Sequence, residues 1–146
     1  MTVKKTGILN KHLAGELAAL GHTDAIVIAD AGLPIPAGSN VVDLALVGGI
    51  PSFTDTLEAV LNEIIVEKFE LFAPMREANP AMYKTVTGMM PKQDFCLSEP
   101  EKFIDAVRSA KVVVRTAECT PCCNIILYSA SGVEEMCRPL EVSFPM

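Results

Sequence analysis

The feature that most limits the fold is a continuous apolar run, Ala25 to Ala29, that lies directly between Asp24 and Asp30. A strand with one wet face alternates apolar and polar residues. An unbroken apolar run of this length is typical of a strand that is covered on both faces. The run therefore predicts a strand buried inside a layered domain.

Helix and strand patterns alternate along the rest of the chain. Leu13, Leu17 and Leu20 recur at helical spacing, which predicts a helix over about residues 11–20. Further helices are expected at about 55–62, 80–88 and 99–109, and further strands at about 41–47, 64–72, 93–97, 111–115 and 124–128. The alternation predicts an α/β fold, a single layered domain with a mixed or largely parallel sheet flanked by helices.

Capping residues mark where the later helices begin. Thr54 is the expected cap of the helix at 55–62, and Asn79-Pro80 supplies an N-cap and a proline at the first position of the next helix. Ser98 and Glu101 have the spacing of a capping box. We therefore expect Ser98 to cap the helix that follows it.

The bulk composition limits the partners. A chain of 146 residues that is 50% hydrophobic fits one domain, expected to span residues 1–146. The net charge of -6 argues against nucleic acid or an anionic membrane surface as a partner, which leaves small molecules and other protein chains. A mean hydropathy of +0.35 is high for a soluble monomer, so we expect a homo-oligomer that buries apolar surface between subunits.

The apolar runs and the cysteines indicate the compartment. No secretory pattern follows the first lysines, and the apolar runs are far shorter than the roughly 20 residues that cross a bilayer. Five cysteines is an odd number, which favours reduced thiols over a disulfide framework. The expected location is therefore cytoplasmic, with no membrane partner.

Two polar side chains flank the apolar run and outline a proton-transfer site. His22 precedes it, and histidine has an ordinary pKa of about 6.5, which lets it trade a proton near neutral pH. Asp30 follows it, where site residues of α/β sheets often lie, before a loop that Pro34 and Pro36 stiffen. The alternatives are a turn histidine that caps the preceding helix and a turn aspartate that bonds nearby amides.

The segment from Cys119 to Cys123 contains a C-x-x-C pattern, which suggests a redox pair or half of a metal site. The sequence offers no second ligand pair at close spacing, and the pattern precedes an expected strand rather than opening a helix. Small thiols that fill a tight turn are therefore the favoured interpretation, and no metal is expected.

Several segments together carry a family resemblance. They are Gly7 to Asn10, the G-H-T-D block Leu20 to Asp24, the D-A-G-L-P-I-P block Asp30 to Pro36, Asp43 to Leu46, Gly49 to Phe53, Arg115 to Pro121 and Asn124 to Leu127. The chain in these segments resembles the D-ribose pyranase family, whose superfamily includes the L-fucose mutarotases. The G-H-T-D and D-A-G-L-P-I-P blocks are the specific part of the resemblance.

The resemblance implies a function and assigns roles to residues. It implies a cytoplasmic α/β protein that assembles into rings, a pentamer or a decamer of two pentamers. Such a protein interconverts pyranose and furanose forms, or anomers, of a free sugar without a cofactor or metal. His22 corresponds to the family's proton donor, and Asp30 and Asn124 correspond to residues that hold the sugar.

The chain also departs from the family. Cys122-Cys123-Asn124 stands where the family commonly has Tyr-Ala-Asn, so a thiol replaces a phenol among the substrate-binding residues. Pro100 aligns with a family histidine, and the tail at about 129–146 extends past the family's usual end. Three functions therefore stay open: an isomerase with altered sugar preference, a sugar-binding or regulatory paralogue without turnover, and a thiol-based function at Cys119 to Cys123.

Overall fold

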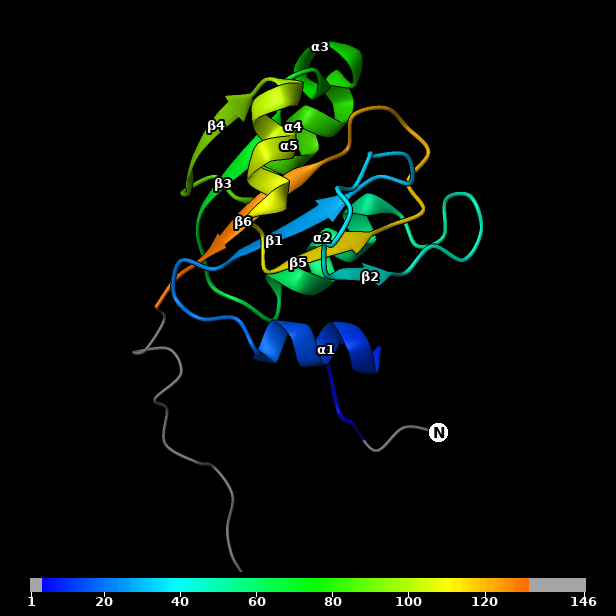
Figure 1. Ribbon diagram of the computed structural model, residues 1–146, viewed down its shortest axis with the longest axis vertical. Coiled ribbons are helices and arrows are strands. Elements are labelled where there is room, and N and C mark those ends of the chain that lie inside the picture. Colours follow the sequence, from blue (N-terminus) through cyan, green and yellow to red (C-terminus); the bar gives the residue numbers. More distant parts are fainter. Residues whose placement is uncertain (1–3, 132–146) are drawn as a thin grey trace, which may run out of the picture.

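The computed structural model describes residues 4–131, which form a six-stranded sheet with helices on both faces (Figure 1). The strands are β1 (Ala25–Ala29), β2 (Val41–Asp43), β3 (Val66–Phe72), β4 (Asp94–Ser98), β5 (Val112–Arg115) and β6 (Ile125–Ser129). The helices are α1 (Lys11–Ala18), α2 (Phe53–Leu61), α3 (Met75–Ala78), α4 (Pro80–Met89) and α5 (Pro100–Arg108). None of these helices is long and apolar enough to cross a membrane.

The sheet is mixed, with the order β2-β5-β1-β6-β3-β4. β6 is antiparallel to both of its neighbours, β1 and β3, whereas the other pairs are parallel. The α/β prediction of a layered domain with a mixed sheet is therefore confirmed.

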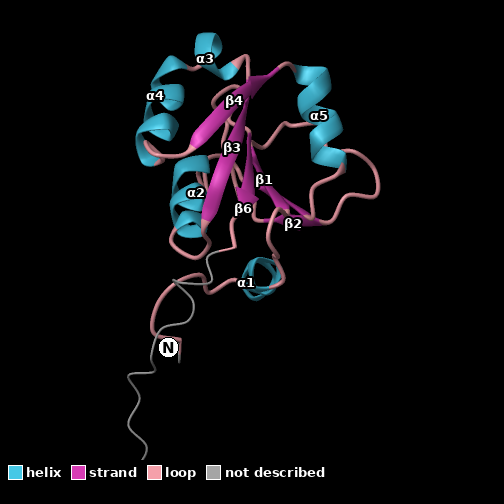
Figure 2. Cartoon of the chain, turned by 90° about the vertical axis from the view of Figure 1, so that its left-hand side faces the viewer, coloured by secondary structure: helices cyan, strands magenta, loops and turns pink. Residues whose placement is uncertain are grey.

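The apolar run at 25–29 becomes the buried strand near the middle of the sheet. Ile26 and Ile28 face a core with α2 and α4, and Val27 and Ala29 face a second core with α5. All four side chains are completely buried. Figure 2 shows α2, α3 and α4 on one side of the sheet and α5 on the other. Cover on both faces explains why this strand has no polar residue.

Two expected helix starts are wrong by a few residues. Ser52, not Thr54, caps α2, because its hydroxyl accepts a 3.1 Å hydrogen bond from the amide of Asp55. Ser98 does not cap α5. It is the last residue of β4, where it pairs with Phe72 and is buried. The helix instead begins with Pro100 after Glu99, so sheet pairing overrides the capping-box pattern.

Strand β2 is shorter than the expected 41–47. The chain leaves the sheet after Asp43, where the amide of Leu44 donates a hydrogen bond to the carbonyl of Arg115, the last residue of β5. α3 was not expected, and the tail expected from about 129 lies outside the described residues from residue 132 onward.

The strand directions decide where the polar residues meet. The carboxyl ends of β1, β3 and β5 lie at one edge of the sheet, and antiparallel β6 begins there. Asp30, Phe72 and Asn124 therefore gather at this edge, which is where ligands bind in open α/β sheets. His22 precedes β1 and lies at the opposite edge.

Candidate functional site

Asp30 and Asn124 form a reciprocal pair at the carboxyl edge of the sheet. The amide of Asp30 donates to Oδ1 of Asn124 at 3.0 Å, and Nδ2 of Asn124 donates back to Oδ2 of Asp30 at 3.3 Å. The amide of Gly32 donates to Oδ1 of Asp30 at 3.1 Å. The structure therefore brings together two residues that lie 94 positions apart in the chain, and it fixes the direction of the carboxylate.

Burial raises the pKa of the Asp30 carboxyl above its ordinary value, against the hydrogen bonds from the amides of Gly32 and Leu33 and from Asn124. Half-burial of the side chain is thus the larger influence. A carboxylate with a raised pKa is a stronger base than a carboxylate with the ordinary pKa. Such a group is suited to taking up and returning a proton.

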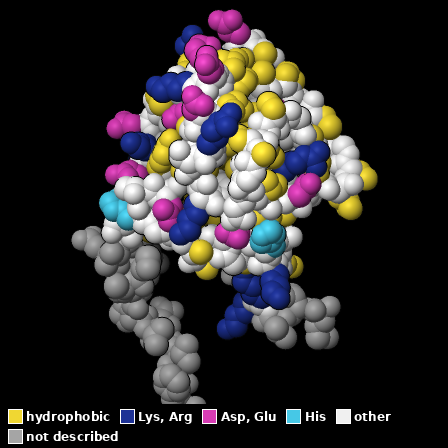
Figure 3. Space-filling model, viewed as in Figure 1, with side chains coloured by type: hydrophobic (Ala, Val, Ile, Leu, Met, Phe, Trp, Pro, Cys, Tyr) yellow, Lys and Arg dark blue, Asp and Glu magenta, His cyan; other side chains and the backbone are white. Residues whose placement is uncertain are grey.

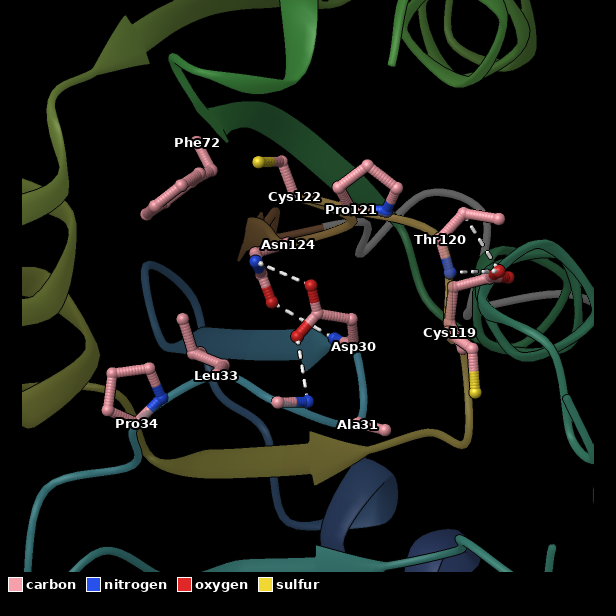
Figure 4. Close-up of a pocket in the computed structure, with 12 residues that line it drawn as sticks. Asp30, Ala31, Leu33, Pro34, Phe72, Cys119, Thr120, Pro121, Cys122 and Asn124 are labelled. Carbon is pink, nitrogen blue, oxygen red and sulfur yellow. Dashed lines mark hydrogen bonds between the residues drawn. The ribbon is translucent and has the colours of Figure 1, made fainter. Parts of the chain in front are cut away.

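A cavity of about 490 Å³ opens beside this pair (Figure 4). Its lining comes from the loop after β1, the loop between β5 and β6, and the last residue of β3, which meet at the same edge of the sheet. These residues are Asp30, Ala31, Gly32, Leu33, Pro34, Phe72, Glu118, Cys119, Thr120, Pro121, Cys122 and Asn124. The size is in the range of small-molecule pockets.

Glu118 is the other carboxylate of the cavity, and its role is structural. Its Oε1 accepts a hydrogen bond from the amide of Phe53 at 3.0 Å, and its Oε2 accepts from the hydroxyl of Thr120 at 2.9 Å and from the amide of Thr120 at 3.2 Å. Burial opposes ionisation, but these bonds outweigh it and lower the pKa of Glu118. The carboxylate ties the cavity loop to the start of α2 and stays ionised.

Arg115 supports the loop that follows Asp30. Its Nη1 donates to both carboxylate oxygens of Asp43 at 3.1 Å, and its Nε donates to the carbonyl of Ala31 at 3.2 Å. Arg115, Glu118 and Phe72 are site residues without a role predicted from the sequence. The available signal was that Arg115 and Glu118 both lie in one of the segments that carry the family resemblance.

The two adjacent cysteines have different positions. Cys122 lines the cavity with a φ of 65°, an uncommon conformation for a residue other than glycine, and its sulfur points toward Phe72 (Figure 4). Cys123 is fully buried and does not line the cavity. Its sulfur accepts a hydrogen bond from Nδ2 of Asn79 at 3.3 Å. The expectation that Cys123 contacts the sugar therefore does not fit its position, because its side chain points into the core.

Both thiols are held neutral. Burial and the charge of Asp30 raise the pKa of Cys122, and burial raises the pKa of Cys123 to about 11. The thiolate is the form that attacks and that binds metals. Within residues 4–131, no three His, Cys, Asp or Glu side chains are grouped so that they could hold a metal ion.

His22 lies far from this cavity in the same chain. At about 3.3 Å per residue, the five-residue strand β1 alone separates its two ends by about 15 Å. The imidazole is 55% exposed, and its Nε2 lies 3.7 Å from Oε2 of Glu67. The carboxylate of Asp24 instead accepts hydrogen bonds at Oδ2 from the amide of Gly21 and from Nζ of Lys111.

Pro100 is the exposed first residue of α5 and does not line the cavity. A proline at this position has no side-chain donor or acceptor, so it offers no polar contact to a ligand.

The fold and the site define a class: α/β proteins with a small-molecule pocket at the carboxyl edge of a mixed sheet, built around a carboxylate of raised pKa. Residues 3–133 match the family model described as the RbsD / FucU transport protein family. The chain belongs to this family.

Two D-ribose pyranases are similar to this chain in sequence. A D-ribose pyranase of Geobacillus thermodenitrificans is 47% identical over 127 residues, which is 87% of this chain and 96% of that protein. A D-ribose pyranase of Actinobacillus pleuropneumoniae serotype 7 is 44% identical, over 87% of this chain and 97% of its own.

Two solved structures of similar proteins have the same fold as this chain. Bacillus subtilis RbsD complexed with D-ribose has a TM-score of 0.83 and 44% identity, covering 87% of this chain and 97% of that chain. A fucose mutarotase from Streptococcus pneumoniae in complex with L-fucose has a TM-score of 0.71 at 22% identity, over 84% of this chain and 93% of its own, and shows the shared fold.

Proposed function

We propose that this chain is an isomerase that interconverts cyclic forms of a free monosaccharide such as D-ribose by acid and base catalysis of ring opening. The observation that carries the proposal is the Asp30–Asn124 pair, a half-buried carboxylate of raised pKa held in place beside a cavity. The names of relatives that match over most of their length, D-ribose pyranases, support the same reaction.

The reaction needs one base and one acid. A base removes the proton of the anomeric hydroxyl as the bond between the anomeric carbon and the ring oxygen breaks, and an acid protonates that oxygen. Reclosure through the same or another hydroxyl reverses both transfers, so no proton is gained or lost. Asp30 is the base in this proposal, and Asn124 aims it by donating to Oδ2.

His22 is the proposed acid, and it must come from a second copy. Within one chain β1 holds it at the far edge of the sheet, whereas its imidazole is exposed and so is available to a neighbouring subunit. A cavity open on one side and an exposed histidine elsewhere are complementary parts of a site between subunits.

The surface supports assembly of copies. Leu46, Val47 and Ile50 are 78%, 57% and 57% exposed on the loop between β2 and α2, where hydrophobic side chains gather (Figure 3). This loop adjoins the cavity, because the amide of Gly49 donates to the carbonyl of Ala117 at 2.7 Å. A pentamer or decamer would bury this apolar surface.

The free thiols of Cys96, Cys119, Cys122 and Cys123 support the reducing cytoplasm as the location.

Saturation-transfer NMR on D-ribose tests the proposal. The protein should accelerate exchange between the pyranose and furanose signals, and His22→Ala and Asp30→Asn should each abolish the acceleration. The exposed pair of Asp105 with Arg108 offers a matched control, and Asp105→Asn should keep full activity. Binding of ribose without faster exchange would reject the isomerase and favour a non-catalytic sugar-binding protein. Reversible disulfide formation or zinc binding without any sugar binding would favour the thiol-based function, which the neutral thiols argue against.

A further inference from the structure

The polar groups of the cavity are unevenly distributed. Thr120 lies on the side of the loop away from Phe72 in Figure 4, and its hydroxyl donates to Glu118. The Glu118 carboxylate also accepts from the amides of Phe53 and Thr120. Asp30 and Asn124 are also bonded to each other, but Figure 4 shows them beside Leu33 and Cys122, where a ligand in the cavity can reach them. Among the lining side chains of this chain, a sugar hydroxyl therefore finds its hydrogen-bond partners on this wall.

The opposite wall is apolar. Leu33 and Pro34 form its lower part in Figure 4, and Phe72 and Cys122 form its upper part. Phe72 is fixed there by an edge-on contact with Phe103, with ring centroids 5.3 Å apart. The neutral thiol of Cys122 is a weak hydrogen-bonding group.

A hydroxyl directed at this wall would lose its water and gain no equivalent partner, which disfavours its binding. A hydrogen or methyl group at the same position would instead fill the apolar space. Resting on the proposed function, we propose that the preferred substrate is a deoxy monosaccharide that turns its carbon without a hydroxyl toward Leu33, Phe72 and Cys122. We assign this preference to Cys122, because its neutral thiol lines the cavity and is a weak hydrogen-bonding group where a hydroxyl of nearly equal size would be a strong one.

The test compares D-ribose with 2-deoxy-D-ribose and 3-deoxy-D-ribose, both of which keep the 4- and 5-hydroxyls that close the furanose and pyranose rings. Exchange between their cyclic forms is measured by saturation transfer, and kcat/KM is obtained for each sugar. At least one deoxy sugar should exceed D-ribose, by a factor of about 10 to 100, the range expected for one group in an apolar pocket. Equal or higher kcat/KM for D-ribose than for both deoxy sugars would overturn the proposal.

Variants locate the preference. Cys122→Ser supplies a hydroxyl at nearly equal volume and should reduce the ratio of deoxy sugar to D-ribose by about fivefold, the effect of one ordinary hydrogen bond. Cys96→Ser makes the same change at an exposed cysteine on β4 and should leave the ratio unchanged. An unchanged ratio in Cys122→Ser would contradict the role of Cys122.

Binding separates this proposal from the proposed function. Calorimetric dissociation constants for the three sugars are measured on His22→Ala, whose cavity wall is intact. Tighter binding of a deoxy sugar without exchange in the wild-type protein would reject the isomerase and keep the preference. Exchange with tighter binding of D-ribose would keep the isomerase and reject the preference.

Discussion

The two ends of β1 carry side chains of opposite character. Asp30 at the carboxyl end is half-buried, accepts hydrogen bonds from Gly32 and Asn124, and has a raised pKa. His22 at the amino end is 55% exposed and has one long contact, with Glu67. The carboxyl end of β1 thus forms part of a pocket wall within the chain, whereas the amino end carries a side chain exposed on the surface. His22 and Asp30 can therefore act in one site only if two copies of the chain meet.

The largest expected effect on the exchange rate comes from Asp30, at the carboxyl end of β1. Asp30→Asn keeps the shape and a hydrogen-bond acceptor but removes the base, so we expect the rate of ring-form exchange to fall by about 10² to 10⁴. The unfolding midpoint should stay close to that of the wild type. Exchange rates from NMR and a thermal melt check both parts, and retention of more than half the activity would remove Asp30 from the proton transfer.

Glu118 lines the same cavity as Asp30, but we expect it to stabilise the fold rather than take part in the reaction. Glu118→Gln weakens the bonds to the amide of Phe53 and to Thr120. We expect a loss of about 1.5–3 kcal/mol in the free energy of unfolding, typical of hydrogen bonds to a charged group. Urea denaturation measures it, with the exposed Glu77→Gln as the control. Loss of activity without loss of stability would mean that Glu118 acts on the substrate.

The pH dependence of stability distinguishes the two carboxylates further. Asp30 has a raised pKa, so its ionised form opposes folding, and the wild type should gain stability relative to Asp30→Asn as the pH falls from 7 through that pKa. Glu118 has a lowered pKa, so its stabilisation is present above the unfolded-state pKa and is lost on acidification through the folded one. Urea titrations of the wild type and both variants between pH 7 and pH 3 should show the two opposite trends.

The smallest expected effect lies at the exposed end. The 3.7 Å contact between His22 and Glu67 joins two half-exposed groups, and such pairs contribute about 0–1 kcal/mol. Glu67→Gln should therefore change the exchange rate by less than about fivefold. A loss as large as that of His22→Ala would show instead that Glu67 orients the imidazole in the assembled site.

Local sequence patterns were enough to predict most of the fold, because burial of apolar side chains produces both the patterns and the elements. The apolar run at 25–29 predicted a doubly covered strand, and the Leu13 and Leu17 stripe predicted α1, since burial decides both. The errors at Ser98 and β2 arose where pairing with a distant strand prevailed over a local signal. Pairing across 20 or more residues leaves no local pattern.

The site was predictable only in part for the same reason. The resemblance pointed to Asp30 and Asn124, and the structure places them in contact. The burial of Cys123 and the bonding of Glu118 depend on how the 117–124 loop packs against Asn79 and Phe53, which no spacing in the sequence reveals. The separation of His22 from Asp30 follows from the length of β1, which is visible in the sequence once the strand is accepted.

Mixing two inactive variants tests most directly the claim that the site joins Asp30 of one copy to His22 of another. His22→Ala and Asp30→Asn chains are unfolded, combined in equal amounts and refolded together, and ring-form exchange is measured. Half of the sites take Asp30 from a His22→Ala chain, and half of those meet an intact His22, so about a quarter of wild-type activity should return whether the copies form a ring or a two-fold pair. Each variant refolded alone should stay inactive. A mixture that stays as inactive as its parents would contradict the claim.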